Sequence, residues 1–288
     1  MMDKPRKYAD ATAFRRALED RLKQKSKTEG LDLQRLLREV AFDRLLARLF
    51  IREPAPWVLK GGYALELRIK EARATKDIDL ALRQALGNES GLPLNAAIFE
   101  ELAKAAAHNL DDFFSFEIGE AMQDLPGAPY GGARFPVESR LDDRTFVRFH
   151  IDIGAGDVLL TPLELTKGHD WLEFAGIASP SFATICQEQH FAEKVHAYTL
   201  PRKGPNSRSR DLVDMLLLIG SGRMNRTKVQ EALDATFKRR KSHPLPATLE
   251  PPPKEWAEPY ARMARECGVT DTLAEAFDIL SHYFNKKK

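Results

Sequence analysis

The chain has 288 residues, 43% of them apolar and 30% charged, and this composition excludes a largely disordered protein. Lysine and arginine number 44 against 42 acidic residues, so the net charge of +2 neither favours nor excludes a nucleic-acid partner. With two cysteines, no apolar signal core at the start and no long apolar run, the sequence predicts a cytoplasmic protein without disulfides or membrane contact.

The first half of the chain has the pattern of an α/β domain. Helical periodicity covers residues 8–26 and 31–51, and the second helix is expected to end before Pro54. The segment WVLKGG predicts a short strand that ends in a glycine turn, YALELRIKE predicts a helix, and TKDIDLALR predicts a second strand. A helix over residues 94–108 and three segments rich in β-branched and aromatic residues follow, namely FFSFEIG, GARFPVE and TFVRFHIDIGAG.

The second half has a different pattern, in which five helical segments follow one another from residue 181. They begin SFATICQEQH, SRSRDLVDML, NRTKVQEALD, KEWAEPYARM and TDTLAEAFDI. The proline-rich stretch SHPLPATLEPPPK is predicted to be a stiff linker among them. We therefore expect a mixed α/β domain with the N-terminal helices over residues 1–175, and a helical bundle over residues 176–288. The segment 161–171 fits neither pattern.

Two aspartates lie two residues apart in the predicted strand TKDIDLALR. Side chains two apart on a strand point to the same face, so Asp77 and Asp79 can reach one site while Ile78 is buried behind them. Unpaired carboxylates this close repel each other and require a cation. Magnesium suits them, because it takes few protein carboxylates and completes its shell with water and substrate phosphates. Gly61 and Gly62, before a predicted helix, offer backbone amides to such a phosphate.

A third carboxylate would complete a two-metal site. The strand TFVRFHIDIGAG places Asp152 on the same face as His150, which makes Asp152 the first candidate. Asp157 falls in a predicted loop and remains the alternative. The sequence thus predicts Asp77, Asp79 and Asp152 as ligands of Mg²⁺, or of Mn²⁺ in its place.

The glycine turn, the helix and the Asp-x-Asp strand together resemble the DNA polymerase β-like nucleotidyltransferase superfamily. Within it the chain is similar to the AbiEii/AbiGii nucleotidyltransferase toxin family, which includes mycobacterial toxins that modify transfer RNA. The resemblance implies a polymerase β-like α/β domain with a mixed sheet, followed by a helical domain, and it implies that Gly61, Gly62, Arg73 and Thr75 bind the nucleotide. The family pattern KGG-x-AL followed by R-x-T/S-x-D-I-D-L is matched by Lys60, Gly61, Gly62, Ala64 and Leu65, and then by Arg73, Thr75, Asp77, Ile78, Asp79 and Leu80.

A second family motif lies in the helical half. The segment HFAEKVHAYTLPRKGPNSRSRDLVDMLLL matches Glu-Lys-x-x-Ala, a basic loop and Arg-Asp-Leu-x-Asp. By this resemblance Lys194 contacts the triphosphate, Arg210 binds the nucleotide, and Asp211 lies in the active site or positions one of these two. The loop between the two parts of the motif carries Arg202 and Lys203, and its basic side chains suit phosphate contacts.

Each of these residues also has a purely structural interpretation. An Asp-x-Asp pair can lie by chance on an exposed strand, Arg73 can be a charge at a helix end, and Thr75 can belong to the strand alone. Lys194 can pair with Glu193 or Glu188, and Asp211 can be favoured by the dipole of the helix that it begins. The next aspartate of that helix, one turn further on, is interpreted as structural.

The motifs leave three functions open. The first is a nucleotidyltransferase toxin of a type IV-like toxin–antitoxin system, which uses Mg²⁺ to transfer a nucleoside monophosphate from a nucleoside triphosphate to RNA. Its expected acceptor is the 3′ end of transfer RNA, so that translation and growth stop, and the resemblance implies a winged-helix antitoxin of the AbiEi type. The second function keeps this reaction with a protein or small-molecule hydroxyl as acceptor. The third is a GTP-binding regulatory module without turnover, against which the intact Asp77, Asp79 and Asp152 argue.

Overall fold

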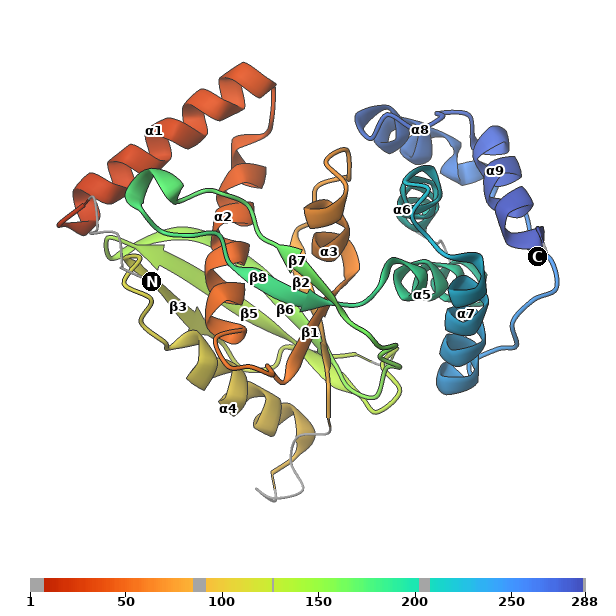
Figure 1. The fold of residues 1–288 in the computed structure, drawn as a ribbon, viewed down its shortest axis with the longest axis horizontal. Coiled ribbons are helices and arrows are strands. Elements are labelled where there is room, and N and C mark those ends of the chain that lie inside the picture. Colours follow the sequence, from red (N-terminus) through yellow and green to blue (C-terminus); the bar gives the residue numbers. More distant parts are fainter. Residues whose placement is uncertain (1–7, 85–91, 126, 202–207, 287–288) are drawn as a thin grey trace. The chain divides into compact units, whose positions relative to one another are not determined.

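The computed structural model describes residues 8–84, 92–125, 127–201 and 208–286. They form two compact units (Figure 1). The division differs from the predicted boundary after residue 175, because two short segments of the first half pack with the helices of the second half. The first unit comprises Met1–Leu59, Ala74–Gly156 and Leu165–Thr184, and the second comprises Lys60–Arg73, Asp157–Glu164 and Ile185–Lys288.

The first unit contains helices and a mixed sheet, as the sequence predicts. Its helices are α1 (Ala11–Glu29), α2 (Leu33–Leu49), α4 (Leu94–Ala106) and the 3₁₀ turn η1 (Glu173–Ala175). The strands of the sheet are β1 (Trp57–Lys60), β2 (Asp77–Leu82), β3 (Phe114–Ile118), β4 (Gln123–Asp124), β5 (Gly132–Leu141), β6 (Arg144–Gly154), β7 (Glu164–Lys167) and β8 (Ser181–Thr184).

The strands of this sheet pair in the order β3-β5-β6-β2-β1-β8-β7, and β4 also pairs with β5. Strand β2 runs parallel to β6, and β1 runs parallel to β8. Strand β5 is antiparallel to β3, β4 and β6. The sheet is therefore mixed, which confirms the fold class that the resemblance implies.

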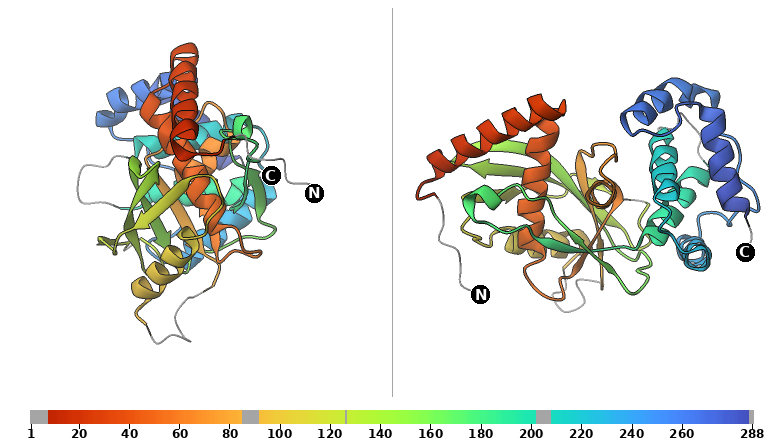
Figure 2. Two further views of the ribbon diagram at one scale, coloured as in Figure 1. Left: turned by 90° about the vertical axis from the view of Figure 1, so that its left-hand side faces the viewer. Right: turned by 45° about the horizontal axis from the view of Figure 1, so that its top comes forward.

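Alternation along the strands gives the sheet one apolar face. Ile78 of β2 and Ile151 of β6 are fully buried on it, and each such side chain contributes about 1.5–3 kcal/mol to stability. Helices α2 and α4 lie against this face (Figures 1 and 2), and Phe42 of α2 packs edge-on against Phe149 of β6 with ring centroids 4.8 Å apart. The side chains at alternate positions are left on the opposite, polar face.

The two N-terminal helices begin at aspartate caps. The Asp10 carboxylate accepts a hydrogen bond from the Ala13 amide at 2.8 Å, and Asp32 accepts one from Arg35 at 2.7 Å, each cap being worth about 1 kcal/mol. Gly30 ends α1 with a φ of 67°, in the left-handed region that favours glycine. The Asp10 cap explains why α1 begins three residues later than the periodicity alone predicts.

The second unit is helical and includes the short helix that follows the glycine turn. Leu65 of that helix joins a core with Phe191, Leu212, Val229 and Leu280 from four longer helices. The elements of this unit are α3 (Gly61–Arg68), α5 (Gln187–Thr199), α6 (Ser209–Gly220), α7 (Arg226–Arg240), the 3₁₀ turn η2 (Lys254–Trp256), α8 (Ala257–Glu266) and α9 (Leu273–Asn285).

One element prediction is wrong, and one unexplained segment now has a place. Residues 181–184 form strand β8 rather than the start of a helix, and α5 begins only at Gln187. Phe182 and Thr184 are buried on β8, whereas Ser181 is exposed, which is the alternation of a strand. The segment 161–171 contains β7, whose Thr166 hydroxyl lies 2.8 Å from that of Thr184.

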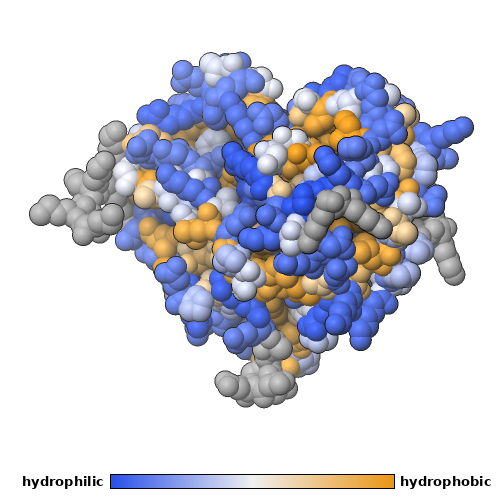
Figure 3. Space-filling model, turned by 45° about the vertical axis from the view of Figure 1, so that its right-hand side comes forward, coloured by the Kyte–Doolittle hydropathy of each residue, from blue (hydrophilic) through white to orange (hydrophobic). Residues whose placement is uncertain are grey.

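The visible surface in Figure 3 is mostly hydrophilic, with apolar side chains in smaller areas between the charged ones. Among the described residues, every helix is too short or too polar to cross a bilayer. Such a mixture of charged and apolar side chains is ordinary for a protein surface.

Candidate active site

Three aspartates lie on the polar face of the sheet, in two adjacent strands of the first unit. The parallel register of β2 and β6 sets Asp77 beside His150 and Asp79 beside Asp152. Because neighbouring strands lie about 4.8 Å apart, the three carboxylates start from adjacent backbone positions. The structure thus brings together the three residues that the sequence predicts as metal ligands.

Arg134 of β5 binds two of these carboxylates. It is the antiparallel partner of Asp152 and donates from Nε and Nη2 to the two carboxylate oxygens at 2.7 and 2.8 Å. Its Nη2 lies 3.5 Å from Oδ2 of Asp77, whose Oδ1 is 3.3 Å from Nδ1 of His150. The hydrogen bond to Asp152 raises the pKa of Arg134, and attraction to Asp77 and Asp79 adds to the rise. Sequence reasoning missed Arg134, because only the strand register reveals its partner.

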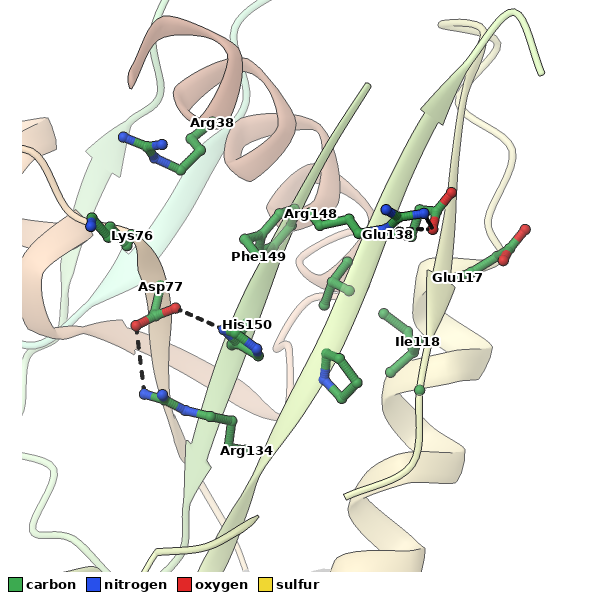
Figure 4. Close-up of a pocket in the computed structure, with 13 residues that line it drawn as sticks. Arg38, Lys76, Asp77, Glu117, Ile118, Arg134, Glu138, Arg148, Phe149 and His150 are labelled. Carbon is green, nitrogen blue, oxygen red and sulfur yellow. Dashed lines mark hydrogen bonds and ion pairs between the residues drawn. The ribbon is translucent and has the colours of Figure 1, made fainter. Parts of the chain in front are cut away.

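A pocket of 780 Å³ opens beside Asp77 in the first unit (Figure 4). In that view Asp77, His150 and Arg134 point toward one another from β2, β6 and β5. A volume of this size accommodates a ligand of several hundred daltons. Among the described residues, its lining carries four basic side chains, Arg38, Lys76, Arg134 and Arg148, and three acidic ones, Asp77, Glu117 and Glu138, and Arg148 pairs with Glu138.

The donor set at this face fits a hard divalent cation. Carboxylate oxygens are the ligands that Mg²⁺ takes from proteins, and the side chains of Asp77 and Asp152 are 31% and 15% exposed. As the side chains stand, no three Asp, Glu, His or Cys residues in the described ranges are gathered closely enough to hold an ion. To hold one ion together, the side chains of Asp77, Asp79 and Asp152 would have to turn toward one another.

The glycine turn joins β1 directly to α3. Gly61 has a φ of 65°, where glycine is favoured because it has no Cβ, and Gly62 is buried in the first turn of the helix. The Lys60 side chain at the N-cap makes no capping hydrogen bond, and uncapped amides at a helix start are groups that bind phosphate. Thr75 lies before β2 and donates from its hydroxyl to the Asp77 carbonyl at 3.3 Å, so it holds the start of the aspartate strand.

In the second unit, Lys194 of α5 lies between two aspartates of α6. Its Nζ is 2.8 Å from Oδ1 of Asp211 and 2.7 Å from Oδ2 of Asp214, and both carboxylates are buried. Burial lowers the pKa of Lys194, but attraction to Asp214 and Asp211 outweighs burial and the pKa rises. These aspartates, rather than Glu193 or Glu188, are the partners that the structure gives to Lys194.

Asp214 is the centre of this cluster. The sequence predicts only a structural role for it, without naming its partners. Arg73 donates from Nε and Nη2 to both oxygens of Asp214 at 2.9 Å. Burial raises the pKa of Asp214, but Lys194 and Arg73 lower it more, to about 2. Arg73 is thus held by a carboxylate of its own unit. The spacing of Asp211 and Asp214, three apart on one helix face, was the signal that could have found this cluster.

Asp157, the alternative third metal ligand, belongs to another ion-pair network of the second unit. It accepts hydrogen bonds from Nζ of Lys60 and, at 2.9 Å, from Nη2 of Arg240. Burial raises the pKa of Asp157, but these two cations outweigh burial and lower it. Because Asp157 is already neutralised by two cations, we retain Asp152 as the candidate.

The basic loop between the two motif parts is described only at its end. Arg202 and Lys203 lie outside the described residues. Arg208 pairs with Asp211 at 3.2 Å, and Arg210 is exposed on α6. The structure therefore connects Arg208, rather than Arg210, to the Lys194 cluster.

Comparison with known proteins identifies a matching family and similar solved structures. The family model described as nucleotidyl transferase AbiEii toxin, type IV TA system, matches residues 44–281. MenT4, a nucleotidyltransferase toxin from Mycobacterium tuberculosis H37Rv, is a similar solved structure, with a TM-score of 0.59 and 16% identity over 92% of this chain and 88% of that one. JHP933 from Helicobacter pylori has a TM-score of 0.46 and 15% identity over 88% of this chain and 98% of its own. No curated protein matches the sequence.

Proposed function

Because the chain belongs to the AbiEii nucleotidyltransferase toxin family of type IV toxin–antitoxin systems, we propose that it transfers a nucleoside monophosphate from a nucleoside triphosphate to transfer RNA. The proposed acceptor group is the 3′-terminal hydroxyl. The observation that supports this most directly is the placement of Asp77, Asp79 and Asp152 on one face of two paired strands.

In the proposed reaction, the oxygen of the acceptor hydroxyl attacks the α-phosphorus of the triphosphate. The bond from that phosphorus to the oxygen that bridges it to the β-phosphate breaks, pyrophosphate leaves, and the hydroxyl proton passes to solvent. Asp77, Asp79 and Asp152 are the residues that would hold Mg²⁺. When bound, the metal would neutralise phosphate charge and lower the pKa of the attacking hydroxyl.

The second unit is proposed to supply positive charge for the nucleotide. Lys194 is the family's triphosphate contact, and its two hydrogen-bonded aspartates support a fixed position for the ammonium group. A preorganised cation loses little entropy when the substrate binds, so we assign Asp211 the role of positioning Lys194. The exposed Arg210 keeps its proposed contact with the nucleotide.

Two further contacts of the nucleotide are proposed from the first motif. The amides of Gly61 and Gly62 begin α3 and are the proposed phosphate ligands. Thr75 holds the start of β2, and Arg73 is proposed to act through its bond to Asp214.

The acceptor and the antitoxin are proposed from the family. Arg38 and Lys76 in the lining of the pocket beside Asp77 support an acceptor that carries phosphate. Expression of the protein is expected to stop growth, and co-expression of a winged-helix antitoxin of the AbiEi type is expected to restore it.

The test incubates the purified protein with total transfer RNA, Mg²⁺ and each α-labelled nucleoside triphosphate in turn, beside the Asp79→Ala variant. We expect label on RNA with one class of nucleotide and none with the variant. Label on no RNA with any of the four nucleotides would contradict a transfer RNA acceptor. Label that appears on protein instead would favour a protein hydroxyl as acceptor.

A further inference from the structure

A bulge in the β5–β6 hairpin brings Arg134 opposite Asp152. Beside the turn, Leu141 pairs with Arg144, and the same count along the strands would set Arg134 opposite the buried Ile151. The register shifts by one residue between Ser139 and Arg140, and this shift moves Arg134 to Asp152 on the polar face. Bulges commonly redirect a side chain beside an active site, so this one gives Arg134 a defined position.

Arg134 uses the oxygen atoms that a metal would need. Its fork binds both oxygens of Asp152, at 2.7 and 2.8 Å, and also reaches Asp77 at 3.5 Å. An ionised carboxylate has about four lone-pair sites, and the bidentate fork occupies the two that face it. A metal that approaches Asp152 from the side of the fork therefore competes with the guanidinium for these oxygens.

The charges make this exchange favourable. Asp77, Asp79 and Asp152 start from adjacent positions of β2 and β6, so their carboxylates repel one another, and a divalent cation brings twice the charge of the guanidinium that it replaces. The side chains of Arg134 and Asp152 are 30% and 15% exposed, so the guanidinium can turn into solvent without becoming a buried, unpaired charge. A divalent ion can thus displace Arg134 without opening the core.

We propose that Arg134 is a resident counter-ion of the metal site, which binds Asp152 and Asp77 in the metal-free protein and is displaced when a divalent cation binds. This proposal rests on the proposed function, because it takes the three aspartates as metal ligands. The resident guanidinium reduces carboxylate repulsion before the metal arrives, and its competition sets the affinity for the metal.

The test is a titration with Mn²⁺, a probe whose free form is counted by electron paramagnetic resonance, without nucleotide or RNA. We expect Arg134→Gln to bind Mn²⁺ about tenfold more tightly than the wild type, because the competitor of the metal is gone. The same variant is expected to have a lower melting temperature without metal and a larger rise in melting temperature on addition of Mg²⁺.

Three further variants complete the titration. Arg148→Gln removes the same charge from the same pocket, but Arg148 is 71% exposed and pairs with Glu138, so its affinity for Mn²⁺ should equal that of the wild type. Arg134→Lys keeps the charge without the fork and should tighten binding by about threefold, which preserves the test if Arg134→Gln does not fold. Asp79→Asn should abolish the binding.

The outcomes separate the two proposals. Equal or weaker Mn²⁺ binding by both Arg134 variants, with binding still lost in Asp79→Asn, would overturn the counter-ion alone. Equal tightening in Arg148→Gln would show a general charge effect and would also overturn it. No binding by the wild type, or equal binding by Asp79→Asn, would overturn the metal assignment of the proposed function and the counter-ion with it.

Discussion

The two charged clusters of this protein use the same residue types in opposite balance. In the first unit, Asp77, Asp79 and Asp152 outnumber Arg134, and the cluster lies on a partly exposed sheet face beside a pocket. In the second unit, Asp211 and Asp214 pair with three cations, Lys194, Arg73 and Arg208, and Asp214 is fully buried.

This difference indicates which cluster can exchange its partners. A buried cluster of paired ions is costly to open, because each ion left alone would be desolvated without compensation. A partly exposed cluster can exchange a partner, because a side chain that leaves it is hydrated by solvent. We therefore assign the exchangeable chemistry to the first cluster, and to the second a fixed arrangement that holds Lys194 in position.

The largest expected effect distinguishes the two candidates for the third carboxylate. Asp152→Asn should reduce transfer to RNA on the order of 10³-fold, which corresponds to about 4 kcal/mol in the barrier, while urea unfolding changes by at most about 1 kcal/mol. Asp157→Asn is the matched control, because it should retain transfer within about threefold but lose about 2–4 kcal/mol of stability by uncovering Lys60 and Arg240. The reverse pattern would make Asp157 the ligand.

The next effect is on stability in the second unit. Asp214→Ala should lower the free energy of unfolding by about 3–5 kcal/mol, because Lys194 and Arg73 lose their shared buried partner. Urea unfolding measures this change, and Asp234→Ala on the exposed side of α7 should stay within about 0.5 kcal/mol of the wild type. A similar small change in Asp214→Ala would show that the cluster is not fixed.

The pH dependence of stability should follow from Asp214. Its pKa in the folded protein is lowered to about 2, so its contribution is complete above the unfolded value near 4 and is lost as the pH falls from about 4 to about 2. The loss should be about 2 kcal/mol and should be missing from Asp214→Asn. Unfolding curves for both proteins at stepwise pH test this, and parallel pH profiles would contradict it.

The smallest expected effect is a loss of stability when the guanidinium of Arg73 is replaced by an ammonium group. Arg73→Lys keeps the charge beside Asp214 but loses the paired hydrogen bonds of the fork, so it should cost about 1 kcal/mol of stability. Chemical denaturation with the wild type as reference is sufficient. A loss as large as that of Asp214→Ala would mean that Arg73, rather than Lys194, is the main partner of Asp214.

The sequence predicts the sheet face with the three aspartates better than it predicts the surroundings of that face. Asp77, Asp79 and Asp152 follow from the two-residue period of strands and from a motif of local residues, and the structure sets them side by side. Arg134 could not be predicted, because its position depends on a hairpin turn at Asp142 and Asp143, both with a φ of 56°, and on a bulge several residues away.

The other features that the sequence did not predict also depend on contacts between residues far apart in the chain. Strand β8 was mistaken for a helix, because its four residues continue into α5 and its pairing partner β1 lies more than a hundred residues earlier. The bond between Arg73 and Asp214 also joins distant residues, whereas the helical periods of the second half are local and were predicted correctly.

The central claim is nucleotidyl transfer that depends on the carboxylates of the first unit. Its most direct test gives the wild type and Asp79→Asn the same nucleoside triphosphate labelled either at the α- or at the γ-phosphate, with transfer RNA and Mg²⁺. We predict that α-label joins the RNA, that γ-label leaves as pyrophosphate, and that the variant transfers neither. Transfer of γ-label, or α-label transfer by Asp79→Asn equal to that of the wild type, would contradict the account.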